Sequence, residues 1–310
     1  MKVGVSMEFT SQAVEQAAHS AGQAVFMLFG ILIVAELLYL GKFTNKKLDF
    51  KEYTVSILSM LGYLGSKTIF AAISILALGQ VLAPYTFFHI DSYNVPLIIA
   101  LVLGVEFCYY TFHRICHRVR IFWAHHSAHH SVHDYVLANA GRLGWFQSIL
   151  GHSLFFTPLL LLGFEAQVLL NTYIAISGYN ALVHTDVFEK LPFEKYLSYI
   201  LVTPSSHRAH HGTNPEYIDT NYGAMFSIYD HLLGTYQPEI DEVEIKYGLV
   251  GQEKRDYNLF NILVGPFINL AKEAYTQKGI VMKFKVFFMP PEWRPEQKEV
   301  QGNKDLDKVS

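Results

Sequence analysis

The sequence is poor in cysteine. Only Cys108 and Cys116 occur among the 310 residues, eight positions apart and outside any CxxC motif. On one helix that spacing separates the two Cα atoms by about 12 Å, which is too far for a disulfide. The sequence therefore predicts neither a disulfide framework nor a thiolate metal site, and the two residues are interpreted as buried free thiols.

The sequence is also poor in charge. Charged residues make up 16% of the chain and hydrophobic residues 51%, whereas an average soluble domain has about 25% charged residues. No lysine or arginine lies between Lys67 and Arg114, or between Arg142 and Lys190. The net charge of −3 and the long apolar runs provide no basic surface for nucleic acid, so no nucleic-acid partner is expected. This composition favours a membrane protein.

The first apolar run covers residues 22–41 and contains a single charge, Glu36. Twenty residues are enough to cross about 30 Å of hydrocarbon. Residues 1–21 have no apolar core followed by a small-residue cleavage site, so a removable signal peptide is not expected. A group of lysines follows the run and marks its cytoplasmic end. These are Lys42, Lys46, Lys47 and Lys51.

Further apolar runs predict a helical bundle that crosses the membrane several times. Residues 55–83 form the second run, and residues 95–112 form a third that returns toward the cytoplasm. Residues 145–162 and 166–183 read as a helical hairpin that enters the membrane and returns. Each limb is near the short limit for spanning, so a shallower hairpin lying at the interface remains an alternative.

These runs divide the chain into three parts. Residues 1–94 are expected to form transmembrane helices and loops, and residues 95–240 a catalytic domain containing the 145–183 hairpin. Residues 241–310 are expected to hold an amphipathic helix over 257–274, interrupted at Pro266, and a disordered tail over 296–310. The predicted fold is all-α: a multi-pass membrane helical bundle with a cytosolic, histidine-rich, di-metal catalytic cap.

Histidine is concentrated in one part of the chain, because 12 of the 15 histidines lie between His113 and His211. They form one HxxxH and two HxxHH clusters, and residues three or four apart on a helix share a face. The clustered residues are His113 and His117, then His126, His129 and His130, then His207, His210 and His211. Eight imidazoles are too many for one four-ligand zinc site and suit two metals. His184 follows the returning limb of the hairpin on the same side and is a candidate ninth ligand.

Ligand type alone does not select the metal, because imidazole binds zinc, copper, iron and nickel. Zinc peptidases with this spacing carry a glutamate after the first histidine as general base; here Arg114 and Arg208 occupy the equivalent positions. A metal transporter would distribute its ligands near the membrane midplane, whereas these clusters follow the apolar runs. A zinc hydrolase or metal-handling protein therefore remains only a lesser alternative to an enzyme that activates dioxygen between two metals.

The histidine clusters and their neighbours resemble the fatty acid hydroxylase and sterol desaturase superfamily of membrane di-iron enzymes. The stretches that carry this resemblance are residues 107–114, 122–131, His184 and residues 207–211. Further stretches resemble the branch of that superfamily containing alkylglycerol monooxygenase and its bacterial relatives; they are residues 184–186, 203–215 and 219–223, Asp230 with Gly234 and Thr235, and residues 290–295. Together the similarity covers roughly residues 95–295.

The resemblance implies a di-iron centre that uses dioxygen and two electrons to hydroxylate a C–H bond of a lipid: a fatty acyl, sterol or ether-lipid substrate. A desaturase with the same centre remains an alternative. The resemblance also implies a separate electron donor or reductase, which in the animal enzyme of this branch is tetrahydrobiopterin. The expected location is the bacterial inner membrane or the endoplasmic reticulum, with the catalytic side cytosolic.

The same resemblance assigns all nine histidines as iron ligands: His113, His117, His126, His129, His130, His184, His207, His210 and His211. Ligating histidines donate their second ring N–H to an acceptor, often a carboxylate. The candidate acceptors are Glu106, Asp134, Asp186, Asp219, Asn221 and Asp230, with Asp219 and Asp230 favoured. His125 and His133 adjoin the second cluster but lie off its spacing, and they are expected either to support the ligands or to lie at the surface.

Three positions depart from the pattern of the ether-lipid branch. Arg118 stands where that branch commonly has glutamate, Val136 where it has asparagine, and Ser206 where it often has histidine. None of the three is a candidate ligand, so the metal site is unaffected. All three lie where substrate or cofactor selectivity is set, so neither ether-lipid cleavage nor pterin dependence is assumed.

Overall fold

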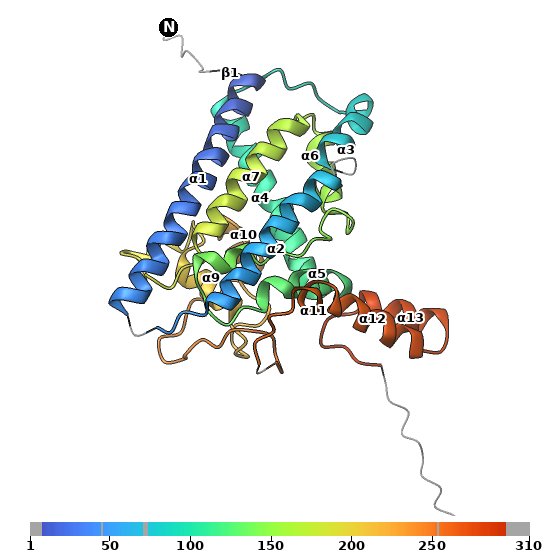
Figure 1. Cartoon of the computed structure of the whole chain (residues 1–310). Coiled ribbons are helices and arrows are strands. Elements are labelled where there is room, and N and C mark those ends of the chain that lie inside the picture. The colour runs from blue at the N-terminus through green and yellow to red at the C-terminus, as the bar shows by residue number, and fades with distance from the viewer. Residues whose placement is uncertain (1–7, 45, 71–73, 253, 296–310) are drawn as a thin grey trace, which may run out of the picture.

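The computed structural model describes residues 8–44, 46–70, 74–252 and 254–295, and almost all regular structure within them is helical. The strands are two residues long: β1 (Phe9–Thr10) pairs antiparallel with β2 (Ser92–Tyr93). This small ribbon closes one end of a helical bundle (Figure 1). The prediction of a helical fold is confirmed.

Four long helices run side by side in the bundle (Figure 1). They are α1 (Ser11–Phe43), α2 (Phe50–Ile69), α4 (Val95–Arg118) and α7 (Ala166–Leu182). Side-chain caps fix where α1, α2 and α4 begin, because an oxygen of Thr10, Asp49 or Asn94 accepts an otherwise unpaired backbone N–H of the first turn. The main apolar core lies between α4, α7 and the short helices beside them.

Shorter helices connect and close the bundle. Those between the long helices in the sequence are α3 (Ile75–Leu82), η2 (Ala83–Tyr85), η3 (Leu137–Gly141), η4 (His152–Phe156) and α6 (Thr157–Leu161), and α8 (Glu194–Leu197) follows α7. At the foot of the bundle lie α5 (Arg120–His130), α9 (Pro204–His211) and α10 (Ile228–Leu233). The last helices, α11 (Leu259–Leu263), α12 (Gly265–Thr276) and α13 (Ile280–Phe288), extend sideways from that foot (Figure 1).

Two helices are long and apolar enough to cross a membrane among the residues described, α1 and α4. Their best 18-residue windows have mean hydropathies of 2.3 and 1.9, and only 17% and 33% of those windows are buried inside the protein. Most residues of each window are therefore at least partly exposed; in α1, Met27, Ile31 and Leu38 are exposed to 66–68%. Such exposed apolar surface fits contact with lipid or with another protein. The predicted runs at 22–41 and 95–112 fall within these helices.

The other predicted runs are less regular. The run at 55–83 is divided between α2 and α3, with residues 71–73 outside the described part of the chain. The first limb of the 145–183 hairpin is not one helix: it consists of turns, η4 and the five-residue α6. Gly151 has φ +77, a left-handed conformation that interrupts the limb. The returning limb is the 17-residue α7, as expected.

Two helices, α11 and α12, cover most of the predicted amphipathic helix over 257–274, and the break between them at Val264 lies just before the expected interruption at Pro266. Pro266 stands in the first turn of α12, where its missing N–H and fixed φ are tolerated. Helix α13 was not predicted. The expected disordered tail at 296–310 lies outside the described residues.

The lysine-rich connection between α1 and α2 lies at the same end of the bundle as α5 and α9. The Lys46 ammonium is 2.9 Å from the carboxylate of Asp186, which follows α7. Asp49 binds Arg255 at 3.0 Å. The predicted shared side of the lysines and the histidine clusters is thus reproduced in space.

Candidate metal centre

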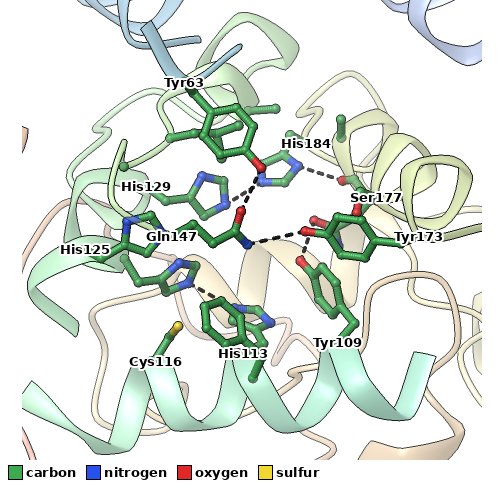
Figure 2. Close-up of a pocket in the computed structure, with 17 residues that line it drawn as sticks. Tyr63, Tyr109, His113, Cys116, His125, His129, Gln147, Tyr173, Ser177 and His184 are labelled. Carbon is green, nitrogen blue, oxygen red and sulfur yellow. Dashed lines mark hydrogen bonds between the residues drawn. The ribbon is translucent and has the colours of Figure 1, made fainter. Parts of the chain in front are cut away.

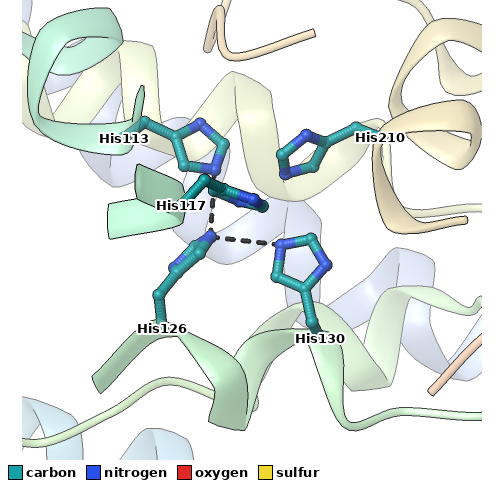
Figure 3. A group of neighbouring side chains, drawn as sticks. All are labelled: His113, His117, His126, His130 and His210. Atoms are coloured by element: carbon teal, nitrogen blue, oxygen red, sulfur yellow. Dashed lines mark hydrogen bonds between the residues drawn. The ribbon is translucent and has the colours of Figure 1, made fainter. Parts of the chain in front are cut away.

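Nine buried or half-buried histidines gather at the foot of the bundle in two adjacent groups. Group 1 consists of His113, His117, His126, His130 and His210, and Figure 3 shows these five rings converging from three segments. Group 2 consists of His129, His184, His207 and His211. Within each group the nearest ring nitrogens all lie within 4.8 Å of one another. The nine histidines proposed from the sequence are the nine that the fold brings together.

Helical spacing delivers these rings to the two groups. In α5, His126 and His130 are four residues apart and both face group 1, while His129 faces group 2. Helix α9 does the reverse: His207 and His211 face group 2. Each HxxHH cluster therefore serves both groups. The groups meet where the rings of His130 and His211 stack with centroids 4.4 Å apart.

The ring nitrogens are spaced like ligands around an ion. The Nε2 atoms of His113 and His126 are 3.0 Å apart, and those of His129 and His184 are 3.1 Å apart. Two nitrogens at right angles, each about 2.1 Å from a metal, would be about 3.0 Å apart. His117, His210 and His211 each have a buried Nε2 with no hydrogen-bond partner among the described residues. A pair of metal ions would satisfy these nitrogens, so the residues fit such a centre.

The rings are held neutral, as a metal ligand must be. Burial lowers the pKa of His184 and of His210 to about 4. Burial, followed by repulsion from neighbouring imidazoles, lowers the pKa of His126, His129, His130, His207 and His211 well below the usual value. At neutral pH the site therefore presents unprotonated nitrogens.

Backbone carbonyls orient three of the rings. Nδ1 of His113 lies 2.9 Å from the carbonyl of Tyr222, and Nδ1 of His210 lies 2.7 Å from that of Thr220. His184 makes the same contact with Asn180 at 2.8 Å. A neutral ring that donates Nδ1–H to a carbonyl leaves its Nε2 lone pair free for a metal.

Two buried carboxylates hold the 220–226 loop that provides these carbonyls for group 1. Glu106 accepts the backbone N–H groups of Ala224, Met225 and Phe226, the first at 2.7 Å. Asp230 accepts those of Tyr222 and Gly223 at 2.7 and 2.8 Å. Contrary to expectation, Glu106 and Asp230 therefore do not accept from the histidine rings. They hold the loop whose carbonyls accept from those rings.

The remaining predicted acceptors have different partners. Asp219 is 3.7 Å from Nδ1 of His117 and also forms an ion pair with Arg118. Asn221 adopts a left-handed conformation, with φ 56, and donates to backbone carbonyls on either side of the loop. Asp134 binds Arg255, and Asp186 binds Lys46. Among the six candidates, only Asp219 lies beside a histidine ring in the described contacts.

Some supporting residues were missed from the sequence. Buried Glu36 in α1 accepts the N–H of Leu137 at 2.6 Å and the hydroxyl of Thr185, next to His184. Its signal was visible as the single charge in an otherwise apolar run, since such a residue usually has a specific partner. His125 is buried beside the site but belongs to neither group, as expected. Buried His152 packs against Phe112.

A cavity of about 130 Å³ opens between the histidines and the interior of the bundle (Figure 2). Both groups reach it, through His113 and His126 and through His129 and His184. Its other wall carries polar side chains in a hydrogen-bonded chain. Gln147 accepts from the Tyr63 hydroxyl at 2.8 Å and from the Lys67 ammonium at 2.7 Å, and it donates to the Tyr173 hydroxyl at 3.3 Å. A cavity of about 150 Å³ holds one benzene molecule, so this space fits a short segment of an alkyl chain and not a whole lipid.

Comparison with known proteins bears on the same region. Residues 98–235 match the profile of the fatty acid hydroxylase family. The chain is 35% identical over 216 residues to alkylglycerol monooxygenase of Homo sapiens, covering 67% of this chain and 45% of that protein. It is 34% identical over 198 residues to alkylglycerol monooxygenase of Xenopus tropicalis, covering 62% of this chain and 42% of that protein.

A bacterial relative is also similar. The ornithine lipid hydroxylase OlsE of Rhizobium tropici is 30% identical over 165 residues, which cover 52% of this chain and 49% of that protein. The chain thus spans about half the length of the curated relatives it matches. No solved structure gives a significant match.

Proposed function

We propose that this chain, whose residues 98–235 match the fatty acid hydroxylase family, is a membrane-bound di-iron monooxygenase that hydroxylates a C–H bond of a lipid. The observation that carries the proposal is the convergence of nine neutral histidines in groups of five and four beside one cavity. Relatives named as lipid hydroxylases and monooxygenases support the reaction type.

Each histidine group would hold one iron ion. Group 1 would offer five nitrogens from α4, α5 and α9, and group 2 four nitrogens from α5, α9 and His184. The bound pair of ions supplies the capacity to activate dioxygen with two electrons. One oxygen atom enters the C–H bond of the lipid, and the other leaves as water with two protons taken from solution.

The protein's own residues would position the substrate and limit the access of water. The cavity is partly enclosed by α4, α5, α7 and the polar chain of Tyr63, Gln147 and Tyr173, so only a short part of a lipid would be exposed to the histidine-lined wall. Phe112 and Cys116 line the same space from α4. Reaction in a small, partly enclosed space would limit the number of carbons that reach the oxidising wall and reduce contact with competing water.

We assign the protein to a membrane through α1 and α4, whose exposed apolar surfaces suit lipid contact. α2 and the 145–183 hairpin would complete a multi-pass bundle, with the hairpin inserted less deeply because its first limb is broken. The lysines between α1 and α2 would put the histidine end in the cytosol, of a bacterial inner membrane or of the endoplasmic reticulum. A separate electron donor or reductase would supply the two electrons.

The test is reconstitution of the full chain in lipid nanodiscs with iron and a chemical reductant. We expect about two irons per chain and transfer of one ¹⁸O atom from ¹⁸O₂ to a lipid product detected by mass spectrometry. Loss of two hydrogens without oxygen gain would instead identify a desaturase. One zinc per chain without oxygen consumption would contradict an oxidative function altogether.

A further inference from the structure

The outer face of the α12–α13 hairpin (residues 265–288) exposes several large apolar side chains. Tyr275 is 84% exposed, Ile280 78%, Val281 64% and Phe284 60%. The Phe284 and Phe288 rings stack with centroids 4.2 Å apart, which makes the patch continuous along α13. Among the described residues no other part of the chain covers this face, and large contiguous apolar patches on a protein surface usually mark an interaction site.

The same hairpin is basic in a chain that is acidic overall. Residues 265–288 contain four lysines and one glutamate, a net charge of +3, whereas the whole chain has −3. The glutamate, Glu273, is already paired with Arg120 of α5. Lys283 and Lys285 alternate with the apolar residues of α13, and Lys278 lies in the turn before it. The partner of this surface is therefore apolar and carries negative charge.

The inner face of the hairpin packs against α5, the helix that carries His126, His129 and His130. Leu270 and Ala274 of α12 and Val286 of α13 form a buried cluster with Ala124 of α5. Helix α5 supplies three of the histidines of the metal centre. The hairpin is thus rigidly attached to the helix that carries the ligands, and anything that binds its outer face also positions that helix.

The orientation of the hairpin selects the partner. α12 and α13 extend across the foot of the bundle, whereas α1 and α4 run along its axis (Figure 1). If α1 and α4 cross the membrane, the hairpin lies along its surface, where an amphipathic helix inserts its apolar face among acyl chains and directs lysines to the headgroups.

We propose that the α12–α13 hairpin is an interfacial anchor that inserts Ile280, Val281 and Phe284 into the cytosolic leaflet and binds anionic lipid headgroups through Lys278, Lys283 and Lys285. The anchor sets the depth at which α5 and the metal centre lie. This inference rests on the proposed membrane location and is independent of the reaction. Its partner is a lipid surface and not a second protein.

The experiment uses the full chain in nanodiscs of phosphatidylcholine alone or with phosphatidylglycerol. Single cysteines at Val281, Phe284 and Lys283 carry an environment-sensitive fluorophore; the native Cys108 and Cys116 are buried. Residue 283 lies on a different face of α13 from residues 281 and 284. We expect a lipid-borne quencher to act about two-fold more strongly at positions 281 and 284 than at 283, and more strongly when anionic lipid is present.

Charge variants test the headgroup contact. The triple variant K278Q/K283Q/K285Q should lose the dependence on anionic lipid, and the matched variant K278R/K283R/K285R should keep it. Equal quenching by water-soluble acrylamide at all three positions would overturn the anchor. Protection from both quenchers that increases with protein concentration would also overturn it, in favour of a protein partner. Co-elution of the protein with nanodiscs tests membrane residence separately, so failure of that premise is distinguishable.

Discussion

The two histidine groups differ in ligand number and in the parts of the fold that support them. Group 1 has five histidines, and two of its rings, His113 and His210, are oriented by the 220–226 loop, which Glu106 and Asp230 hold. Group 2 has four, and His184 is oriented by a carbonyl of α7, near a segment held by Glu36. Group 1 therefore has one more histidine than group 2, and each group has its own carboxylate support: Glu106 and Asp230 for group 1, and Glu36 for group 2.

Ligand number predicts that group 2 is the more easily destroyed. His211→Ala leaves three histidines in group 2, whereas His126→Ala leaves four in group 1. We expect His211→Ala to lose one iron per chain and activity by at least about 100-fold, beyond the 10–100-fold effect of removing an outer partner. His126→Ala should retain two irons with weaker binding. Iron analysis with lipid product assays measures both, and the opposite order would contradict the assignment of groups.

The supporting carboxylates predict a separable effect on each group. Glu106→Leu leaves three buried N–H groups of the loop without their acceptor, at about 1–3 kcal/mol for each. We expect a lower melting temperature and loss of the group 1 iron first. Glu36→Leu removes the acceptor of Leu137 and Thr185 and should affect group 2 first.

Glutamine variants provide the matched controls for these carboxylates. Glu106→Gln and Glu36→Gln keep one acceptor oxygen and the side-chain volume, so their effects should be smaller than those of leucine. Iron-specific spectroscopy of each variant assigns the lost ion to a group. If both leucine variants lose the same ion, the two supports are not independent.

Asp219 predicts a smaller effect confined to group 1. Its carboxylate lies 3.7 Å from Nδ1 of His117, so Asp219→Asn should weaken iron binding by about 10-fold, the lower end for an outer partner. Asp186→Asn is the matched control, because Asp186 pairs with Lys46 and not with a ligand. Equal effects from the two variants in a chelator competition would remove any specific role for Asp219.

Sequence patterns predicted the gathering of the histidines but not their division between groups. The i, i+3 and i+4 spacing places side chains on a shared helix face, and this sufficed for α5 and α9. That His129 faces the opposite group from His126 and His130 depends on the packing of α9 against α5, which no local spacing encodes. The carbonyls of Thr220, Tyr222 and Asn180 were not predicted, because a backbone acceptor has no residue signature.

The fold was predicted best where length and apolarity sufficed. The helices containing residues 22–41 and 95–112 are long and apolar, so composition alone located them. The prediction of a helix over the first limb of the hairpin (residues 145–162) was wrong. This segment contains Gly151 in a left-handed conformation and forms turns and short helices instead. Trp145 crosses α2 at Gly62, where a Cβ would lie 2.2 Å from its ring. Such tertiary contacts favour a bent chain over a continuous helix.

The smallest predicted effect tests whether α5 transmits a disturbance to both groups equally. The guanidinium of Arg120, at the start of α5, donates hydrogen bonds to Glu273 and lowers the pKa of that carboxyl. A lowered folded pKa means that the pair stabilises the protein above the unfolded value of about 4.3 and that this contribution disappears as pH falls through the folded pKa. Glu273→Gln should therefore cost about 0.5 kcal/mol at pH 7, and progressively less as the pH falls through the lowered pKa of the carboxyl and Glu273 becomes protonated. Melting curves of the metal-free protein across this range measure the effect.

Because the pair fixes the beginning of α5 and touches no histidine, iron content should remain unchanged in both groups. Selective loss of iron from either group would show that the helix does not move as one unit.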